Sequence, residues 1–309
     1  MKKLFAAIAA FGLAATMAFA QDYNEAVDAF NAGAQALETN KTEALAYFRS
    51  ALEKAQAIEG EEAAELVIKC KEAIPGVLMS IAKEQINEGN YDAALASLAE
   101  TKAVATEYNI AAVAEEAETL VPNVYMRKGS TLLKAKDFAG AAVALEEVTK
   151  LTPEDSKAFL LLGQAQQQAG NNEAAVAALE KANEMGEAQA AKLLSTIYLK
   201  QGQALLKGGK AADAIAALEK SNSYVESANA YKLIASAYTK SGKSANAIEA
   251  YKKYLEVSPN AKDADDILFT IAATAQKAGD KATAKEYYQK LAGSAKYAAQ
   301  ADAQLKVLK

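Results

Sequence analysis

The chain has 309 residues, of which 51% are hydrophobic and 24% are charged, and its formal net charge is −5. This acidic balance argues against a nucleic-acid-binding protein, because such proteins need basic surfaces that neutralise phosphates. Only 4 residues are proline, whereas alanine is abundant. Alanine is the best helix former and proline the worst, so the composition predicts an all-α protein with ample material for a large core.

Residues 1–20 have the pattern of a signal peptide. Two lysines precede an uncharged apolar stretch over 4–17, and the small residues of Ala18–Ala20 then favour cleavage before Gln21. A membrane anchor is the alternative, but the apolar stretch is short for a membrane span. No cysteine follows the cleavage site. We therefore expect an exported protein, periplasmic or secreted, with no lipid anchor and no integral membrane span after cleavage.

Pairs of small residues, twelve positions apart, recur along the rest of the chain. The pairs are Ala32 and Ala44, Ala82 and Ala94, Gly129 and Ala141, Gly163 and Ala175, Gly202 and Ala214, Ala235 and Ala247, and Ala272 and Ala284. A large apolar or aromatic residue follows four positions after each second member. A glycine stands five positions before the second member in every pair except the first and third, which have Thr39 and Lys136 there.

This pattern predicts a helical hairpin as the repeated unit. The glycine can adopt the left-handed conformation that ends a first helix, and a second helix then folds back along it. The two small residues allow the helix axes to approach closely, while the large residue fills the groove beside them. Each hairpin has one apolar stripe for its partner helix and another for the next hairpin.

The segments 160–182 and 233–259 resemble tetratricopeptide repeats, and Pro153 and Pro259 stand where that family often closes its second helix. The resemblance covers about residues 23–292 and implies a right-handed superhelical solenoid of about seven hairpins. The first unit, around 32–51, is degenerate and could instead be a capping hairpin. Tryptophan, common early in the family's first helix, is absent, and its place is taken by Tyr125, Phe159, Tyr198, Tyr231 and Leu268.

The solenoid is expected over 21–293, with longer units early in the chain. The segments 61–87 and 110–134 keep an apolar helical phase through Pro75 and Pro122, which indicates long first helices that are either kinked at the proline or broken into two nearly collinear helices. The tail, 294–309, has apolar residues at helical spacing between polar ones. It reads as a C-terminal capping helix that shields the last hairpin.

Residues that perform catalysis or bind metals are scarce. The chain has no histidine and one cysteine, Cys70, which we interpret as a buried small hydrophobe, with an intermolecular disulfide as the alternative. Acidic clusters at 59–65 and 263–266 are typical of helix N-termini rather than of calcium loops. We therefore predict no catalytic residue, no metal and no cofactor. An enzyme would have to work through carboxylates alone.

The family resemblance implies a concave groove formed mainly by the first helices, which often holds an extended peptide or a partner helix. The candidate groove residues lie just after, or three before, the small residue of each first helix: Met79, Lys83, Met126, Ser130, Leu160, Gln164, Leu199, Gln203, Lys232, Ser236 and Phe269. Glutamine and serine can bond a peptide backbone, and methionine and leucine adapt to its side chains. Alternatively, these are ordinary packing and solvated positions.

Lysines just before the turns, at positions 134, 207, 240 and 277, are interpreted as structural, because cations are favoured at helix C-termini. The sequence as a whole favours a non-enzymatic protein–protein interaction scaffold or adaptor of the bacterial cell envelope. The alternative is a ligand- or glycan-binding component of an envelope uptake system. A nucleic-acid partner is not expected, and the sequence identifies neither the protein partner nor the oligomeric state.

Overall fold

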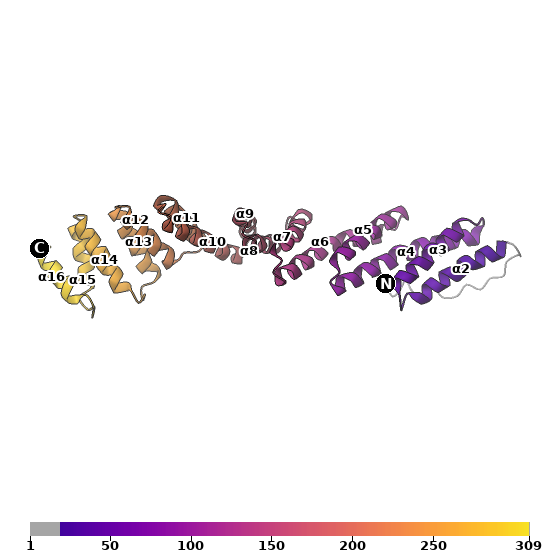
Figure 1. Ribbon diagram of the computed structural model, residues 1–309, viewed down its shortest axis with the longest axis horizontal. Helices are drawn as coiled ribbons and strands as arrows, with labels where there is room; N and C mark the ends of the chain where they lie inside the picture. The colour runs from indigo at the N-terminus through magenta and orange to yellow at the C-terminus, as the bar shows by residue number, and fades with distance from the viewer. Residues whose placement is uncertain (1–18, 309) are drawn as a thin grey trace. The chain divides into compact units, whose positions relative to one another are not determined.

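The computed structural model describes residues 19–308, which form helices joined by short connections and contain no strand (Figure 1). The helices are α2 (Phe19–Ala36), α3 (Lys41–Gln56), α4 (Glu61–Glu88), α5 (Tyr91–Glu107), α6 (Ala111–Lys134), α7 (Phe138–Leu151), α8 (Ser156–Gln168), α9 (Asn172–Glu184), α10 (Ala188–Lys207), α11 (Ala211–Tyr224), α12 (Ala228–Lys240), α13 (Ser244–Val257), α14 (Ala264–Lys277), α15 (Lys281–Lys290) and α16 (Ala298–Val307). The prediction of an all-α protein is confirmed. The proposed signal peptide lies, up to residue 18, outside the described residues.

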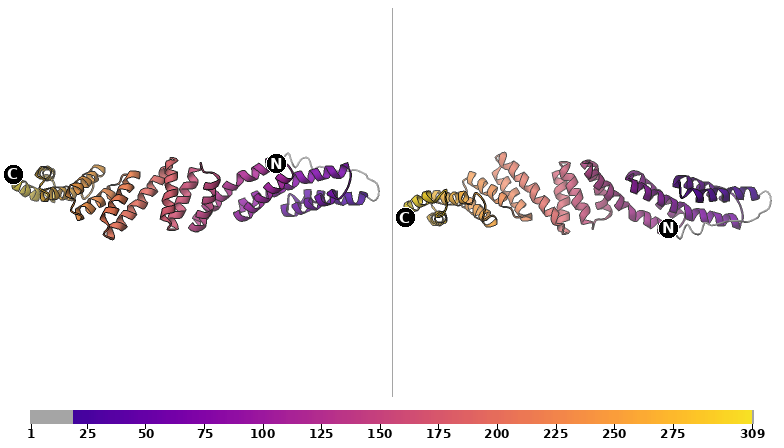
Figure 2. Two further views of the ribbon diagram at one scale, coloured as in Figure 1. Left: turned by 90° about the horizontal axis from the view of Figure 1, so that it is seen from above. Right: turned by 90° about the horizontal axis from the view of Figure 1, so that it is seen from below.

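The chain divides into two compact units, Met1–Ala158 and Phe159–Lys309, with the boundary inside α8. In the first unit, α2 to α7 form three consecutive hairpins, and each helix packs on the next one in the sequence. One core cluster joins α2, α3 and α4, and a second joins α4, α5 and α6. Figure 2 shows this succession from indigo to magenta.

The second unit continues with the hairpins α8–α9, α10–α11, α12–α13 and α14–α15, followed by α16. One core cluster joins α8, α9 and α10, and a larger one extends from α10 to α16. Within the part of the chain that the structure describes, the helices from α2 to α15 therefore make seven hairpins, as the repeat pattern predicts. The right-handed sense of the superhelix stays a prediction.

The small residues allow the helices of a hairpin to touch. A Cβ atom added to Gly163 would lie 2.5 Å from Cγ of Leu179, and one added to Gly202 would lie 2.6 Å from Cγ of Leu218. Gly129 meets Leu145 in the same way, at 2.6 Å. Each glycine thus makes room for the large residue that is sixteen positions further on, and the close approach of the two helices is confirmed.

The first hairpin differs by one residue from the predicted register. Ala32 is half-buried, and it is Gly33 that lies in the interface, where an added Cβ would be 3.1 Å from the Phe48 ring. The turn of this hairpin has no left-handed glycine. Instead, the Asn40 side chain accepts a hydrogen bond from the backbone N–H of Glu43. The chain therefore reverses with one residue fewer between its two small residues.

The other turns follow the predicted chemistry. The glycines at 89, 170, 209, 242 and 279 all have left-handed backbone conformations, with φ between 71° and 87°. In the hairpin α6–α7 the same place is occupied by Lys136, which adopts φ 63°. A side chain in this region is strained, because its Cβ approaches the carbonyl oxygen.

We therefore expect Lys136→Gly to raise the free energy of unfolding by about 1 kcal/mol, since glycine adopts positive φ without that clash. Urea denaturation of residues 21–309 would measure the change. Lys134→Gly, two residues earlier at the last position of α6, is the matched control. It should be destabilising by about 1 kcal/mol, because glycine is a poor helix former. Loss of stability in Lys136→Gly would contradict the assignment of strain.

The second helices differ in how they begin. Asn40, Asp137 and Asp280 cap α3, α7 and α15 through their side chains, which accept hydrogen bonds from backbone N–H groups. In α11 and α13 the N-cap residues are Lys210 and Lys243, and neither makes a side-chain capping bond. Lysine has no acceptor to offer an N-terminal N–H group.

The two interior prolines do not interrupt their helices. Pro75 lies within α4 and Pro122 within α6, and each helix is continuous through its proline. The last helix, α16, begins at Ala298, four residues after the start of the segment predicted to be helical. Ser294 accounts for this delay, because its Oγ accepts hydrogen bonds from the backbone N–H groups of Lys296 and Tyr297 and so holds a turn before the helix.

Cys70 is completely buried in α4, among the apolar residues that join α2, α3 and α4. Burial raises the pKa of its thiol to about 12, so the side chain stays protonated and unreactive at neutral pH. The interpretation of this residue as a small core hydrophobe is confirmed.

Candidate partner-binding surface

The candidate groove residues of the first unit lie on α4 and α6. Met79 is only 3% exposed and belongs to the core cluster with Ala82 and Val124. The expectation that it lines an open groove is therefore wrong. Lys83 forms an ion pair with Glu116 of α6 and thereby connects neighbouring hairpins. Met126 and Ser130 are half-buried.

The apolar candidates of the second unit also pack inside it. Leu160 is 6% exposed and belongs to the core cluster that joins α8, α9 and α10, while Leu199 packs against the larger cluster. The Phe269 ring stacks on Tyr297, with centroids 4.6 Å apart, so the C-terminal segment covers it. Met79, Leu160, Leu199 and Phe269 therefore pack between helices instead of lining an open groove, whereas Met126 stays a half-buried candidate.

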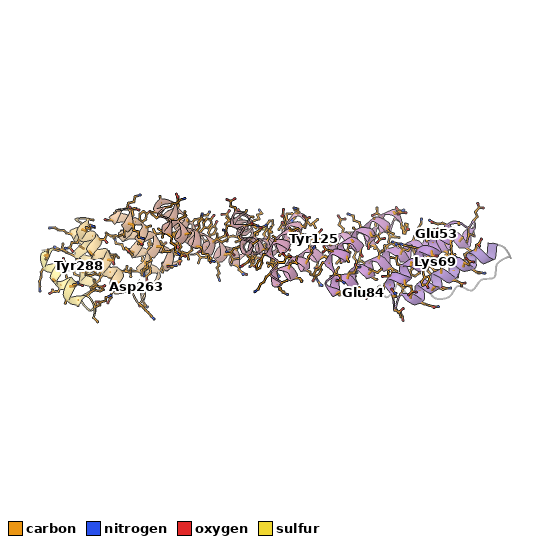
Figure 3. The ribbon with its side chains drawn as sticks, in the orientation of Figure 1. Glu53, Lys69, Glu84, Tyr125, Asp263 and Tyr288 are labelled. Atoms are coloured by element: carbon orange, nitrogen blue, oxygen red, sulfur yellow. The ribbon has the colours of Figure 1, made fainter. Side chains whose placement is uncertain are left out.

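Lys232 takes part in a network that joins α12, α13 and the start of α14. Its ammonium group pairs with the carboxylate of Asp263, the residue labelled in Figure 3, and this carboxylate also accepts a hydrogen bond from the Tyr254 hydroxyl. The Lys232 hydrogen bond, with that of Tyr254, lowers the pKa of Asp263 below its usual range. The Asp263 carboxylate in turn raises the pKa of Tyr254 to about 12.

We expect Asp263→Asn to cost about 0.5–1 kcal/mol of unfolding free energy at pH 7, because the ion pair is partly exposed. The pKa of the carboxyl is lowered in the folded state, so its contribution is present above the unfolded pKa of about 3.9 and is lost as the pH falls through the lower folded value. Denaturation of wild type and variant at pH 7, 5 and 3 would measure how the difference between their unfolding free energies shrinks as the pH falls. Asp302→Asn, which removes an exposed pair within α16, should change little. A difference that does not shrink as the pH falls from 5 to 3 would contradict the ion-pair account.

Three polar candidates keep their hydrogen-bonding groups free, and we call them the polar row: Gln164 of α8, Gln203 of α10 and Ser236 of α12. Each is half-buried, each directly follows the small residue of its helix, and none bonds through its side chain to another described residue. They therefore present amide and hydroxyl groups, which can both donate and accept, at one register in consecutive first helices. In α14 the corresponding residue is Ala273, so the polar row ends there.

The sequence reasoning missed one extension of the polar row. Gln167 lies one helical turn beyond Gln164, is half-buried, and has no side-chain partner within residues 19–308. Its equivalent in α14, Gln276, bonds to Tyr288 and Gln304 instead. The helical period itself could have identified Gln167, because residues three apart lie on the same face of a helix.

Residues 19–308 offer neither a cluster of metal ligands nor a helix that could cross a membrane. No three carboxylate or thiol side chains gather there as metal ligands would. No helix in the same range combines the length and the apolar character that crossing a bilayer requires.

Consecutive helical hairpins with small residues at each helix contact define an α-helical repeat protein. Three models of the tetratricopeptide repeat match the chain, over residues 132–197, 199–264 and 266–294, which together are just over half of it. The chain thus belongs to the tetratricopeptide repeat family, and the resemblance seen in the sequence is confirmed for these residues.

Several solved structures are similar to parts of the chain. A MamA protein is 23% identical, covering 59% of this chain and 96% of its own, with a TM-score of 0.34. The C-terminal part of a TPR repeat-containing protein from Cytophaga hutchinsonii is 20% identical, covering 71% and 81%, with a TM-score of 0.35. PilW, a type IV pilus biogenesis factor, is 19% identical, covering 60% and 93%, with a TM-score of 0.28. No curated protein matches the sequence.

Proposed function

We propose that the protein is a non-enzymatic interaction scaffold or adaptor of the bacterial cell envelope, which binds a peptide or partner protein along the first helices of its repeats. The observation that carries this proposal is the polar row, because its three side chains are held in register by the repeat and have no partner in the described residues. An extended peptide offers N–H and C=O groups at regular intervals, which glutamine and serine can satisfy without reading one particular sequence.

Two features of the sequence support the rest of the proposal. The signal-peptide pattern over 1–20 supports export. The residue inventory supports a binding role, since the chain lacks histidine and its one thiol is buried with a raised pKa. Many of its carboxylates lie in ion pairs or cap helices, where they serve the fold.

The experiment is a quantitative pull-down from an envelope extract with residues 21–309 and with the triple variant Gln164→Ala, Gln203→Ala, Ser236→Ala. We expect one protein in stoichiometric yield with the wild type and at least a tenfold loss with the triple variant. The matched control replaces three polar residues of second helices, Asn183, Ser223 and Gln289, with alanine and should retain the partner. Both variants should melt like the wild type.

A triple variant that keeps the partner would contradict the placement of the surface. Recovery of no protein, together with a thermal shift caused by a sugar or another small solute, would contradict the scaffold itself. That second result would favour the ligand-binding component of an uptake system.

A further inference from the structure

Lysines line one edge of the second unit. The turns between α10 and α11, α12 and α13, and α14 and α15 each have a lysine before and after them: Lys207 and Lys210, Lys240 and Lys243, and Lys277 and Lys281. All six are exposed, and none has a side-chain bond or ion pair with another residue of the described range. Consecutive helices here pack together through short connections, so the three turns lie at the same end of their hairpins. We call these six residues the basic edge.

The fold itself does not account for half of this edge. Lysines 207, 240 and 277 end first helices, where the helix dipole favours a cation. Lys210, Lys243 and Lys281 stand at the beginning of second helices, where the dipole disfavours a cation. Lys210 and Lys243 also occupy N-cap positions that are asparagine or aspartate in the other hairpins. A residue that breaks a local rule in this way suggests a constraint from outside the fold.

At the opposite edge of the unit several charged side chains have partners, although Lys262 has none within the described residues. There the carboxylate of Glu226 accepts a bond from Tyr231, Asp263 pairs with Lys232, and Asp266 pairs with Lys296. Residues 159–309 contain 19 lysines against 15 acidic residues, a net charge of +4 within an acidic chain. The carboxylates nearest the basic edge are Asp213, one turn into α11, and Asp280, whose side chain caps α15. Six of the unit's lysines that lack a partner within the described residues therefore lie at these three turns.

The composition of the turns indicates the kind of partner. Besides lysine they contain glycine, serine, alanine and one aspartate, over 208–210, 241–243 and 278–281. Protein interfaces are anchored by aromatic residues and arginine and are depleted in lysine, so a protein partner fits this edge poorly. Lysine is a flexible point charge that suits a diffuse array of anions. We propose that the basic edge docks the protein peripherally on a bilayer that carries anionic lipid headgroups.

The test is flotation of residues 21–309 with vesicles of phosphatidylcholine alone and with equal parts of phosphatidylcholine and phosphatidylglycerol. We expect binding only to the anionic vesicles at low salt, and its loss at high salt, because the attraction is screened. In the variant Lys210→Asn, Lys243→Asn, partitioning should fall about 25-fold, since one lysine near an anionic surface contributes about fivefold. The same variant should melt at a higher temperature, because asparagine caps the helices.

The matched control is Lys253→Gln, Lys306→Gln, which removes the same charge from ion-paired lysines of α13 and α16. It should bind anionic vesicles nearly as the wild type does. The proposal is overturned if the Lys210→Asn, Lys243→Asn variant binds anionic vesicles as strongly as the wild type does. It is also overturned if the wild type does not bind anionic vesicles at low salt. If the protein bound soluble polyglutamate but not vesicles, the proposed partner would be an acidic macromolecule and the bilayer proposal would be overturned. None of these results depends on the polar row, so the two proposals can fail separately.

Discussion

Replacing Gly202 with alanine should lower the free energy of unfolding by about 2 kcal/mol, although the same change stabilises an ordinary helix interior by about 1 kcal/mol. The new Cβ would lie 2.6 Å from Cγ and 2.8 Å from Cδ2 of Leu218, and 3.2 Å from the carbonyl oxygen of Ala214. Helices α10 and α11 would therefore have to separate, or the leucine would have to leave its preferred rotamer.

Denaturation of the single variants and of the double variant with Leu218→Ala would measure this effect as a thermodynamic cycle. With the leucine shortened, the alanine at 202 has space, and its penalty should disappear. Gly293→Ala is the control, because a Cβ there meets no atom within 4 Å, and it should change stability by less than about 0.5 kcal/mol. A stabilised Gly202→Ala variant would refute close helix contact as the reason for the glycine.

The second large effect is expected at the C-terminal end of the chain. Tyr288, labelled in Figure 3, is 1% exposed. Its hydroxyl donates a hydrogen bond to Gln276, and its ring meets the Phe269 ring edge-on with centroids 5.8 Å apart. Tyr288→Ala should cost about 3–5 kcal/mol, because it leaves a cavity between α14 and α15. Tyr288→Phe keeps the packing and should cost only about 1 kcal/mol, the net value of a hydrogen bond.

The loss in Tyr288→Ala should also be local. Each repeat contacts chiefly its neighbours, so unfolding of α14, α15 and α16 need not carry the rest of the chain with it. Hydrogen exchange should show faster exchange over 264–307 and unchanged protection in α2 to α7. Equal acceleration along the whole chain would mean that the molecule unfolds as one cooperative unit.

Much of the fold could be predicted because each hairpin follows local rules. Gly163 and Gly170 illustrate this: the first permits contact with Leu179, and the second has the left-handed conformation that its place before a turn requires. The register of the first hairpin could not be predicted in the same way. Ala32 and Gly33 are both small, and only packing against Phe48 decides which of them faces the partner helix.

The candidate surface was predictable only in part. The polar row follows from register, because the residue after the buried small position lies at the border of the contact. Met79 and Leu160 were misplaced because a residue three positions earlier borders on either solvent or the next hairpin, depending on how neighbouring units pack. The pairing of Lys232 with Asp263 joins residues 31 positions apart, and no local pattern links them. Lys210 and Lys243, by contrast, could have been noticed in the sequence, because each stands where a residue that caps a helix N-terminus is expected.

The central claim is that the first-helix face of the repeats receives a protein partner, and site-specific photo-crosslinking in living cells tests it most directly. A photoreactive residue would replace Gln164, Gln203 or Ser236 in turn, and Lys253 of α13 as the control. We predict one adduct of the same mass from all three positions of the polar row and none from the control position. Folded, stably expressed variants that give no adduct from the polar row, or the same adduct from position 253, would contradict the claim.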